Sequence, residues 1–318
     1  MKRRVLLAAF ASLSVAGLLS SGTITATSHS TGATYNRFDI VYRTGGPVGG
    51  RASANTNDIL ITIDVPFAGA HDTRANGVNA GGDIVGRYAD STGAHGFLLS
   101  QGTFTTIPIP GTLQDDEGPA RGINARGDIV GHFFDGTGEH AFLLSQGKIT
   151  AIDFPGATGG TEARGISDQG DIVGSYVDSG GRHGFLLSNG VFTTIDVPGA
   201  TLTRARGINN RGNIVGGYDE PNRHGFLLSK GIFTTIDVAL TGTSGTEAGG
   251  INESDRIVGA YFAGGTQHGF LLDGGLFTTI DAPFAGVLGT QARGINARGD
   301  IVGAYHDATG DHGFFETR

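Results

Sequence analysis

The chain has 318 residues, a net charge of −8 and no cysteine. The acidic balance removes the electrostatic basis for binding a nucleic acid backbone, and the lack of cysteine excludes disulfides, thiolate metal sites and lipid-modified cysteine. Glycine supplies 57 residues, more than twice its usual share, without the period of three that collagen requires. Many tight turns are therefore expected.

Residues 1–26 are predicted to be a secretory signal peptide. Basic residues at positions 2–4 precede the apolar run from Val5 to Leu19, and small residues near Gly22 or Ala26 suit a signal peptidase. The run is short for a membrane span, although a retained anchor is the alternative. We expect a bacterial protein that is secreted, periplasmic or on the cell surface, with no membrane segment once the signal is removed.

A repeat of 42 to 45 residues fills residues 57–318. The segment ARGINARGDIVG stands letter for letter at both 120–131 and 292–303. Such a period is typical of stacked units that cannot bury their apolar faces alone. Two landmarks recur in each unit, Gly-Ile/Val-Asn/Ser and His-Gly/Ala-Phe. They contain Asn79, Asn124, Ser167, Asn209, Asn252 and Asn296, and His95, His140, His183, His224, His268 and His312.

Each unit is predicted to contain four short strands. In one unit they are 164–166, 171–176, 183–187 and 191–197, all rich in β-branched, aromatic or other apolar residues. Asn-Gly and similar pairs between the third and fourth strands are strong hairpin signals. The Asn or Ser after the first strand is expected to accept hydrogen bonds from turn amides. Three antiparallel hairpin connections per unit follow.

Four-stranded antiparallel sheets of this kind, arranged radially, form a β-propeller. The last unit ends at Arg318 after its third strand, whereas 59–66 has the pattern of a fourth strand with no complete unit before it. Pairing the two would remove two exposed sheet edges. The sequence therefore predicts an all-β, six-bladed propeller over residues 57–318, closed by an N-terminal strand that completes the last blade, and a monomer.

Residues 27–56 are predicted to be a polar linker or the remnant of a degenerate repeat. Phe38–Arg43 lies as far before Pro66 as Asp83–Arg87 lies before Pro110, which leaves seven blades with a degenerate first blade as an alternative. Six is favoured because Arg51–Asn55 stands where a third strand is needed and supplies no large apolar side chain.

The repeat resembles the bacterial HAF family of extracellular repeats, named for His-Ala-Phe. The similarity covers residues 57–318, and it rests on Gly-Ile-Asn, Gly-Asp-Ile-Val-Gly and His-Ala-Phe-Leu-Leu. Only 140–142 matches the name literally, since the other five copies have glycine in the middle. The resemblance implies an extracellular repeat protein, and because the family has no established activity it transfers no catalytic residue.

The six landmark histidines are predicted to be structural. In five units an aspartate lies five residues before the histidine, so a metal site or a general-base pair is conceivable. Equivalent positions in a six-fold ring lie as far apart as their radius, which prevents one shared site. We expect each aspartate to cap its turn, and each histidine to bind that aspartate or a nearby carbonyl. A single divalent metal in each unit is the alternative.

Four arginines are candidates for binding an anion. The first strand of a propeller blade lines the central channel, which would bring Arg121, Arg164, Arg206 and Arg293 near one axis. The alternative, which we favour, is that each pairs with an aspartate of its own or an adjacent unit, because uncompensated guanidiniums repel. Asn76 and Gly249 replace the arginine in the other two units.

The remaining ionisable positions carry weaker signals. Residues 115–117 and 71–72 are expected to be solvated loop charges, with a calcium or ligand contact as the alternative. His132 and His306 are expected to be exposed. No catalytic, phosphate-binding or metal motif is present, so no catalytic residue, metal or cofactor is predicted.

These observations favour a noncatalytic extracellular or cell-envelope scaffold that binds a glycan, a surface polymer or a protein. Several equivalent weak sites suit a repetitive partner. The alternative is a secreted polysaccharide hydrolase or lyase, or a lactonase, on a six-bladed propeller, which rests on analogy of fold. A purely structural role in an envelope assembly is a third hypothesis.

Overall fold

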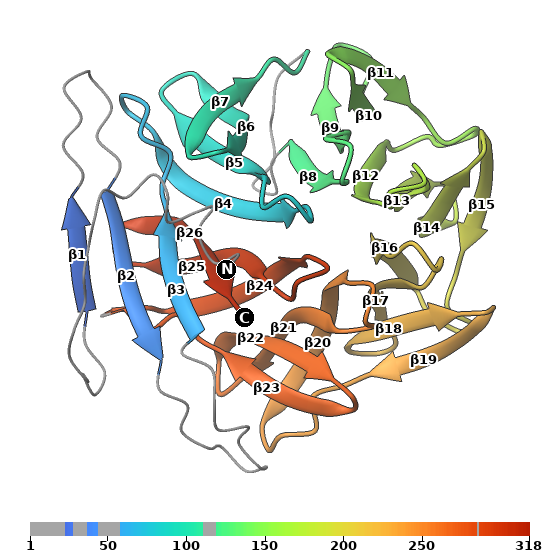
Figure 1. Cartoon of the computed structure of the whole chain (residues 1–318). Coiled ribbons are helices and arrows are strands. Elements are labelled where there is room, and N and C mark those ends of the chain that lie inside the picture. The colour runs from blue at the N-terminus through green and yellow to red at the C-terminus, as the bar shows by residue number, and fades with distance from the viewer. Residues whose placement is uncertain (1–22, 28–36, 44–57, 111–118, 285) are drawn as a thin grey trace.

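The computed structural model describes residues 23–27, 37–43, 58–110, 119–284 and 286–318. Every regular element in these ranges is a β-strand, so the all-β prediction is confirmed. The sheets are arranged radially as the blades of a β-propeller (Figure 1). In the described ranges, no helix has the length and apolar character needed to cross a membrane.

The strands recur in the predicted order. The first strands of the repeats are β4 (His71–Val78), β8 (Ala120–Ile123), β12 (Thr161–Ile166), β16 (Leu202–Ile208), β20 (Thr243–Ile251) and β24 (Gly289–Ile295). The second strands are β5 (Ile84–Asp90), β9 (Ile129–Phe134), β13 (Ile172–Asp178), β17 (Ile214–Asp219), β21 (Ile257–Ala263) and β25 (Ile301–Asp307).

The outer strands complete the sheets. The third strands are β6 (Gly93–Ser100), β10 (Glu139–Ser145), β14 (Gly181–Ser188), β18 (Arg223–Ser229), β22 (Thr266–Asp273) and β26 (Gly310–Thr317). The fourth strands are β7 (Thr103–Ile107), β11 (Lys148–Ile152), β15 (Val191–Ile195), β19 (Ile232–Ile236) and β23 (Leu276–Ile280). The N-terminal strands are β1 (Thr23–Thr27), β2 (Arg37–Arg43) and β3 (Asp58–Ile63).

Consecutive strands of each repeat pair antiparallel. The first three repeats form separate four-stranded sheets, β4–β7, β8–β11 and β12–β15. The later repeats have the same internal order but belong to one larger mixed sheet. Only single parallel residue pairs, Arg223↔Gly245 and Gln267↔Gly289, connect one repeat to the next there. The pairing inside each repeat is therefore the same throughout.

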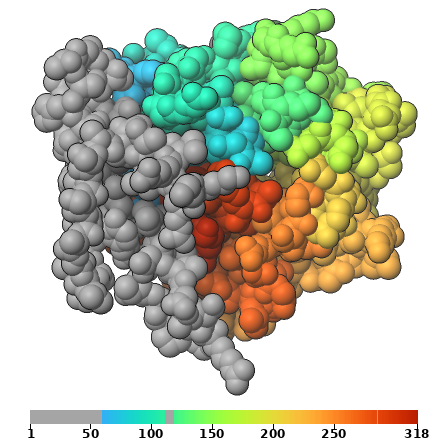
Figure 2. Space-filling view, viewed as in Figure 1, coloured from blue at the N-terminus to red at the C-terminus, as the bar shows by residue number. Residues whose placement is uncertain are grey.

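Strand β3 occupies the place of a fourth strand in the last repeat. It pairs antiparallel with β26, with Gly313 opposite Ile63, just as Gly184 lies opposite Ile195 in a complete repeat. In the space-filling view, blue atoms from the start of the repeat region border red atoms of the last repeat (Figure 2). Strands β2 and β1 continue the same sheet outward, so Phe38–Arg43 does not begin a sheet of its own.

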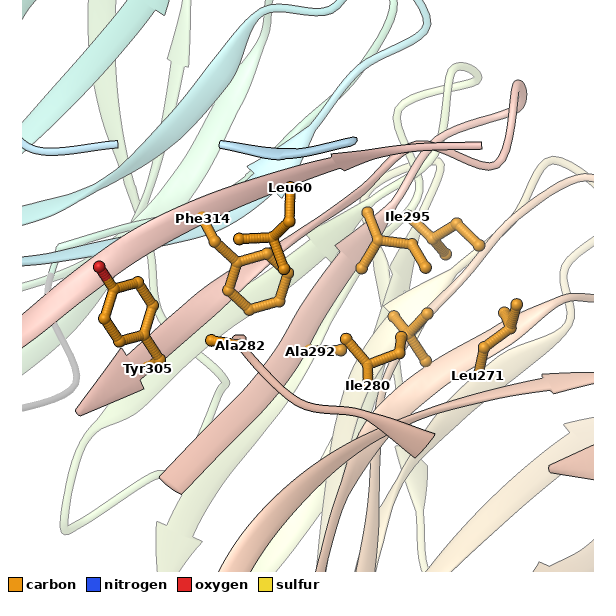
Figure 3. Close-up of a cluster of buried hydrophobic side chains, with 10 residues drawn as sticks. Leu60, Leu271, Ile280, Ala282, Ala292, Ile295, Tyr305 and Phe314 are labelled. Carbon is orange, nitrogen blue, oxygen red and sulfur yellow. The ribbon is translucent and has the colours of Figure 1, made fainter. Parts of the chain in front are cut away.

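The core is built between neighbouring sheets. Each of six apolar clusters combines residues of two adjacent repeats, and each repeat buries one phenylalanine of its third strand completely. Figure 3 shows the cluster in which Leu60 of β3 lies beside Phe314 of β26. Strand β3 thus contributes buried apolar surface as well as backbone hydrogen bonds.

The inner strands contact one another around the whole axis. Their order is β4, β8, β12, β16, β20, β24 and again β4. Each carries a glycine at which an added Cβ would lie 2.7 to 3.0 Å from a backbone atom of the next strand. These glycines are Gly77, Gly122, Gly165, Gly207, Gly250 and Gly294. No larger residue fits at this spacing.

Leu60→Ala tests the contribution of β3 to the core. Leu60 is 1% exposed, so we expect the free energy of unfolding to fall by about 2–5 kcal/mol in chemical denaturation. The matched control is Leu276→Ala, because Leu276 is 67% exposed and should change stability by less than about 0.5 kcal/mol. Equal effects of the two substitutions would contradict the packing of β3.

Candidate functional site

The four predicted arginines gather at one end of the central channel. Together with Glu247 and Gln291 they line one cavity of about 40 Å³. Each arginine stands where the pairing of the first strand with the second shifts by one residue, between an alanine and the inner glycine. Such a β-bulge redirects a side chain, and here the redirected positions face the axis.

The cations at this channel end outnumber the carboxylates. The described residues that line the cavity include four arginines and one carboxylate, Glu247. Glu247 accepts from Arg206 at 2.6 Å, and Arg293 donates to the side-chain oxygen of Asn76 at 3.1 Å. An anion of small size therefore meets a positive field at this end.

Glu162 does not line the cavity, but it neutralises part of the positive charge by binding Arg164. One of its oxygens binds Arg164, and the other accepts from Arg182 at 2.5 Å. Burial acts to raise the pKa of Glu162, but the charges of Arg164 and Arg182 outweigh it and hold that pKa well below its usual range. Burial, followed by the charges of Arg182 and Arg206, lowers the pKa of Arg204.

The aspartates expected to neutralise the channel arginines lie elsewhere. Arg164 binds Glu162, and Arg206 binds Glu247. Asp128 and Asp300 bind Arg126 and Arg298 at the turns after the first strands. Asp153, Asp196, Asp237 and Asp281 bind the landmark histidines. Glu162 and Glu247 each precede the alanine that recurs in the first strands, a position that the sequence pattern did not single out.

The size of the cavity limits what it can hold. About 40 Å³ accommodates a few water molecules or one small anionic group. A sugar ring does not fit there. Any larger ligand would present a carboxylate or a similar group to the arginines while the rest of it lies outside the channel.

A second cluster of ionisable side chains lies between the second and third repeats. His132, Glu139 and Glu162 place possible ligand atoms within 4.8 Å of one another. Arg164 and Arg182 already contact Glu162, so a metal would compete with two guanidiniums. The expected exposure of His132 is wrong, because β12 packs against β9 and buries it. His306 of β25 has a side chain that is 55% exposed, as expected.

The landmark histidines lie in separate repeats and form local contacts. His183 is typical, because it stacks on Tyr176 with ring centroids 5.3 Å apart. Its Nδ1 lies 3.0 Å from Asp196 on the fourth-strand side, and its Nε2 lies 3.3 Å from the turn aspartate Asp178. His95, His224, His268 and His312 stack on a tyrosine in the same way, and His140 forms a tilted contact with Phe133.

The turn aspartate was foreseen, and the fourth-strand aspartate was not. The latter stands 13 residues after the histidine in four repeats, as with His140 and Asp153, and this spacing could have revealed it. In the last repeat Asp64 of the N-terminal segment takes its place. In the first repeat Pro108 stands at the fourth-strand position and offers no carboxylate. Of these two positions, His95 therefore binds only the turn aspartate, Asp90, at 3.0 Å.

The landmark asparagines connect neighbouring repeats at the opposite end of the channel. The side-chain oxygen of Asn252 accepts from turn amides, as expected, while its Nδ2 donates to the carbonyl of Asn296 at 3.0 Å. The same inter-repeat bond is donated by Asn79, Asn124, Asn209 and Asn296. Ser167 has no side-chain amide to donate this bond, and at that boundary Asn210 instead donates to Asp168 at 2.8 Å.

The two stretches predicted to be solvated loop charges are residues 71–72 and residues 115–117. His71 and Asp72 lie at the start of β4 and bind each other at 2.8 Å. Residues 115–117 and most of the predicted signal peptide lie outside the described residues.

No family model and no curated protein matches this chain. Among solved structures, TolB from Acinetobacter baumannii is similar with a TM-score of 0.45 and 14% identity, over 79% of this chain and 64% of that chain. A structure of the Dos1 propeller has a TM-score of 0.37 and 12% identity, over 87% and 74% of the two chains. This chain thus spans less than two thirds of the TolB chain, and neither similarity carries a function to it.

The asparagine bonds can be tested by exchanging residue types. Asn252→Ser removes a buried inter-repeat bond and should lower the free energy of unfolding by about 1 kcal/mol, whereas Ser167→Asn should raise it by about the same amount. Chemical denaturation of both variants provides the measurement. A loss in both variants would show that the inter-repeat bond does not set stability.

The contact of His312 with Asp64 makes stability depend on pH. The hydrogen bond from Asp64 raises the pKa of His312 above 6.5 although burial opposes it. The protonated form therefore stabilises the fold below pH 6.5, and this contribution is lost as the pH rises through the raised pKa. We expect unfolding free energy to fall over that interval, with a smaller slope for His312→Gln. A slope for His312→Gln equal to that of the unchanged chain would contradict this contribution.

Proposed function

We propose that this chain is a noncatalytic extracellular or cell-envelope binding protein that recognises an anionic group of a glycan, a surface polymer or a protein. The observation that carries the proposal is the convergence of Arg121, Arg164, Arg206 and Arg293, from four repeats, on one cavity with a single lining carboxylate. The overall charge of −8 makes this positive end a local feature, which favours a specific site over general attraction.

The scaffold is proposed to be a six-bladed propeller closed by β3. Support comes from the sequence of glycine contacts, which passes from Gly294 to Gly77 in the same way as between the other repeats. The register of β3 on β26, and the hydrogen bond of 3.0 Å between Thr62 and Tyr305, match those of a complete repeat. Strand β2 then extends the last blade and does not form a seventh.

The location is proposed to be outside the cytoplasm. A basic start followed by an apolar run at residues 5–19 supports export, and the resemblance of the repeats to the HAF family agrees with it. The lack of cysteine is compatible with an oxidising compartment, because packing alone holds the fold.

The experiment is binding of the purified exported chain to an array of acidic and neutral glycans, with and without chelator. We expect acidic glycans to be retained and the affinity to fall with salt. Arg121→Gln and Arg293→Gln should each weaken binding by about tenfold, because a charged hydrogen bond contributes about 1.5–3 kcal/mol.

Arg211→Gln is the matched control, since Arg211 is half-exposed at a turn and lies outside the cavity. Retention of neutral and acidic glycans alike, or equal loss in all three variants, would contradict the proposal. Release of fragments from a polysaccharide would instead support the hydrolase or lyase alternative.

A further inference from the structure

A groove of about 410 Å³ lies beside the channel end, over the last two repeats. Phe262 of β21, Gln267 of β22 and Leu288 line it, together with Gln291 and Arg293 of β24. Gln291 and Arg293 also line the channel cavity. A ligand in the groove therefore reaches the positive end of the channel with one of its groups.

Differences between repeats explain why the groove lies here. The position concerned follows the last glycine of the Asp-Ile-Val-Gly pattern in the second strand. The first two repeats carry the buried side chains Arg87 and His132 there. The last two repeats carry Ala260 and Ala304, which line the channel cavity and the groove respectively. Ser175 and Gly217 of the third and fourth repeats are also small, but the side chains of Arg182 and Glu247 lie against them. Over the last two repeats the volume stays open as the groove.

The groove has an apolar wall that is open to solvent. Phe262 is 41% exposed and Leu288 is 61% exposed, whereas the phenylalanines of the third strands are fully buried. Phe262 follows the strand tyrosine, and at this position the other repeats carry Ala89, Phe134, Val177, Asp219 and His306. An exposed aromatic ring in a concave site is a typical surface for an apolar ligand face.

Two amide side chains stand above this wall with donors and acceptors available. Gln267 and Gln291 form no side-chain hydrogen bond with another described residue. At the corresponding positions of the boundary between the last repeat and the first stand Asp311 and Arg74, which bind each other. The groove thus has neutral hydrogen-bonding groups where another repeat boundary has an ion pair.

The outer end of the groove holds a compensated charge cluster. Asp311 accepts from Arg74 at 2.6 Å and lies 3.0 Å from His306. The charge of Asp311 is therefore balanced within the cluster. The inner end has the opposite character, because Arg293 belongs to the cation-rich cavity.

We propose that this groove binds an acidic saccharide, with a sugar ring on Phe262 and Leu288 and its carboxylate at Arg293. The C–H face of a pyranose is apolar and flat, and its hydroxyls match the amides of Gln267 and Gln291. A groove of 410 Å³ holds one or two sugar units. This inference rests on the proposed binding function and gives it a site and a ligand class.

The test is calorimetric titration of the full chain with trigalacturonate and with the neutral galactotriose. We expect trigalacturonate to bind at least tenfold more tightly. Phe262→Ala should weaken it by about tenfold, and Leu288→Ala should weaken it by a smaller factor. The matched controls are Phe277→Ala and Leu276→Ala, because Phe277 is 39% exposed, Leu276 is 67% exposed, and neither lines the groove. Both controls should bind within twofold of the unchanged chain.

The outcomes separate the site from the function. If acidic glycans bind but Phe262→Ala behaves like Phe277→Ala, the groove is not the site, although the binding function stands. If galactotriose binds as tightly as trigalacturonate, the acidic saccharide is wrong. If an acidic peptide binds through Phe262 and trigalacturonate does not, the ligand class is overturned. Absence of any acidic ligand on the array removes the proposed function itself.

Discussion

The contact between neighbouring first strands at six glycines sets the geometry of the rest of the molecule. An added Cβ at any of them would approach the next backbone to within 3.0 Å, so the strands meet more closely than a side chain at these positions would permit. This spacing keeps the channel narrow, and the resulting cavity of about 40 Å³ admits a small group only. The narrow channel therefore excludes a sugar ring but leaves the surrounding face available to one.

The same contact determines where the charged side chains point. A β-bulge lies directly before each inner glycine, and the extra residue of the bulge faces the axis. Four repeats place arginine there, and two place Asn76 and Gly249. The channel is consequently asymmetric in charge although its backbone repeats regularly. Glu162 and Glu247 reduce the repulsion among the guanidiniums without matching their number.

The sequence predicts the strands well because each repeat carries the same turn and strand signals. It also places β3 beside β26, since residues 59–65 carry the pattern of a fourth strand. The gathering of the four arginines follows from their place in the first strand. Contacts across repeats were not predictable from spacing, because they depend on which atoms meet within about 3 Å between separate sheets. The bond from Asn252 to the carbonyl of Asn296, the choice of Glu162 as a partner and the burial of His132 all belong to this class.

A regular frame confines ligand selection to the positions that differ between repeats. The inner glycines recur in every repeat, as do the stacked histidines, and their contacts stay within the scaffold. Variation concentrates on the face around the arginine end of the channel, where Arg87 and His132 give way to Ala260 and Ala304. Large side chains fill that face in the first two repeats, and small ones open it in the last two. Among the described cavities, Arg293 is the arginine that lines both the channel cavity and the groove, so a ligand that uses both must lie over the last two repeats.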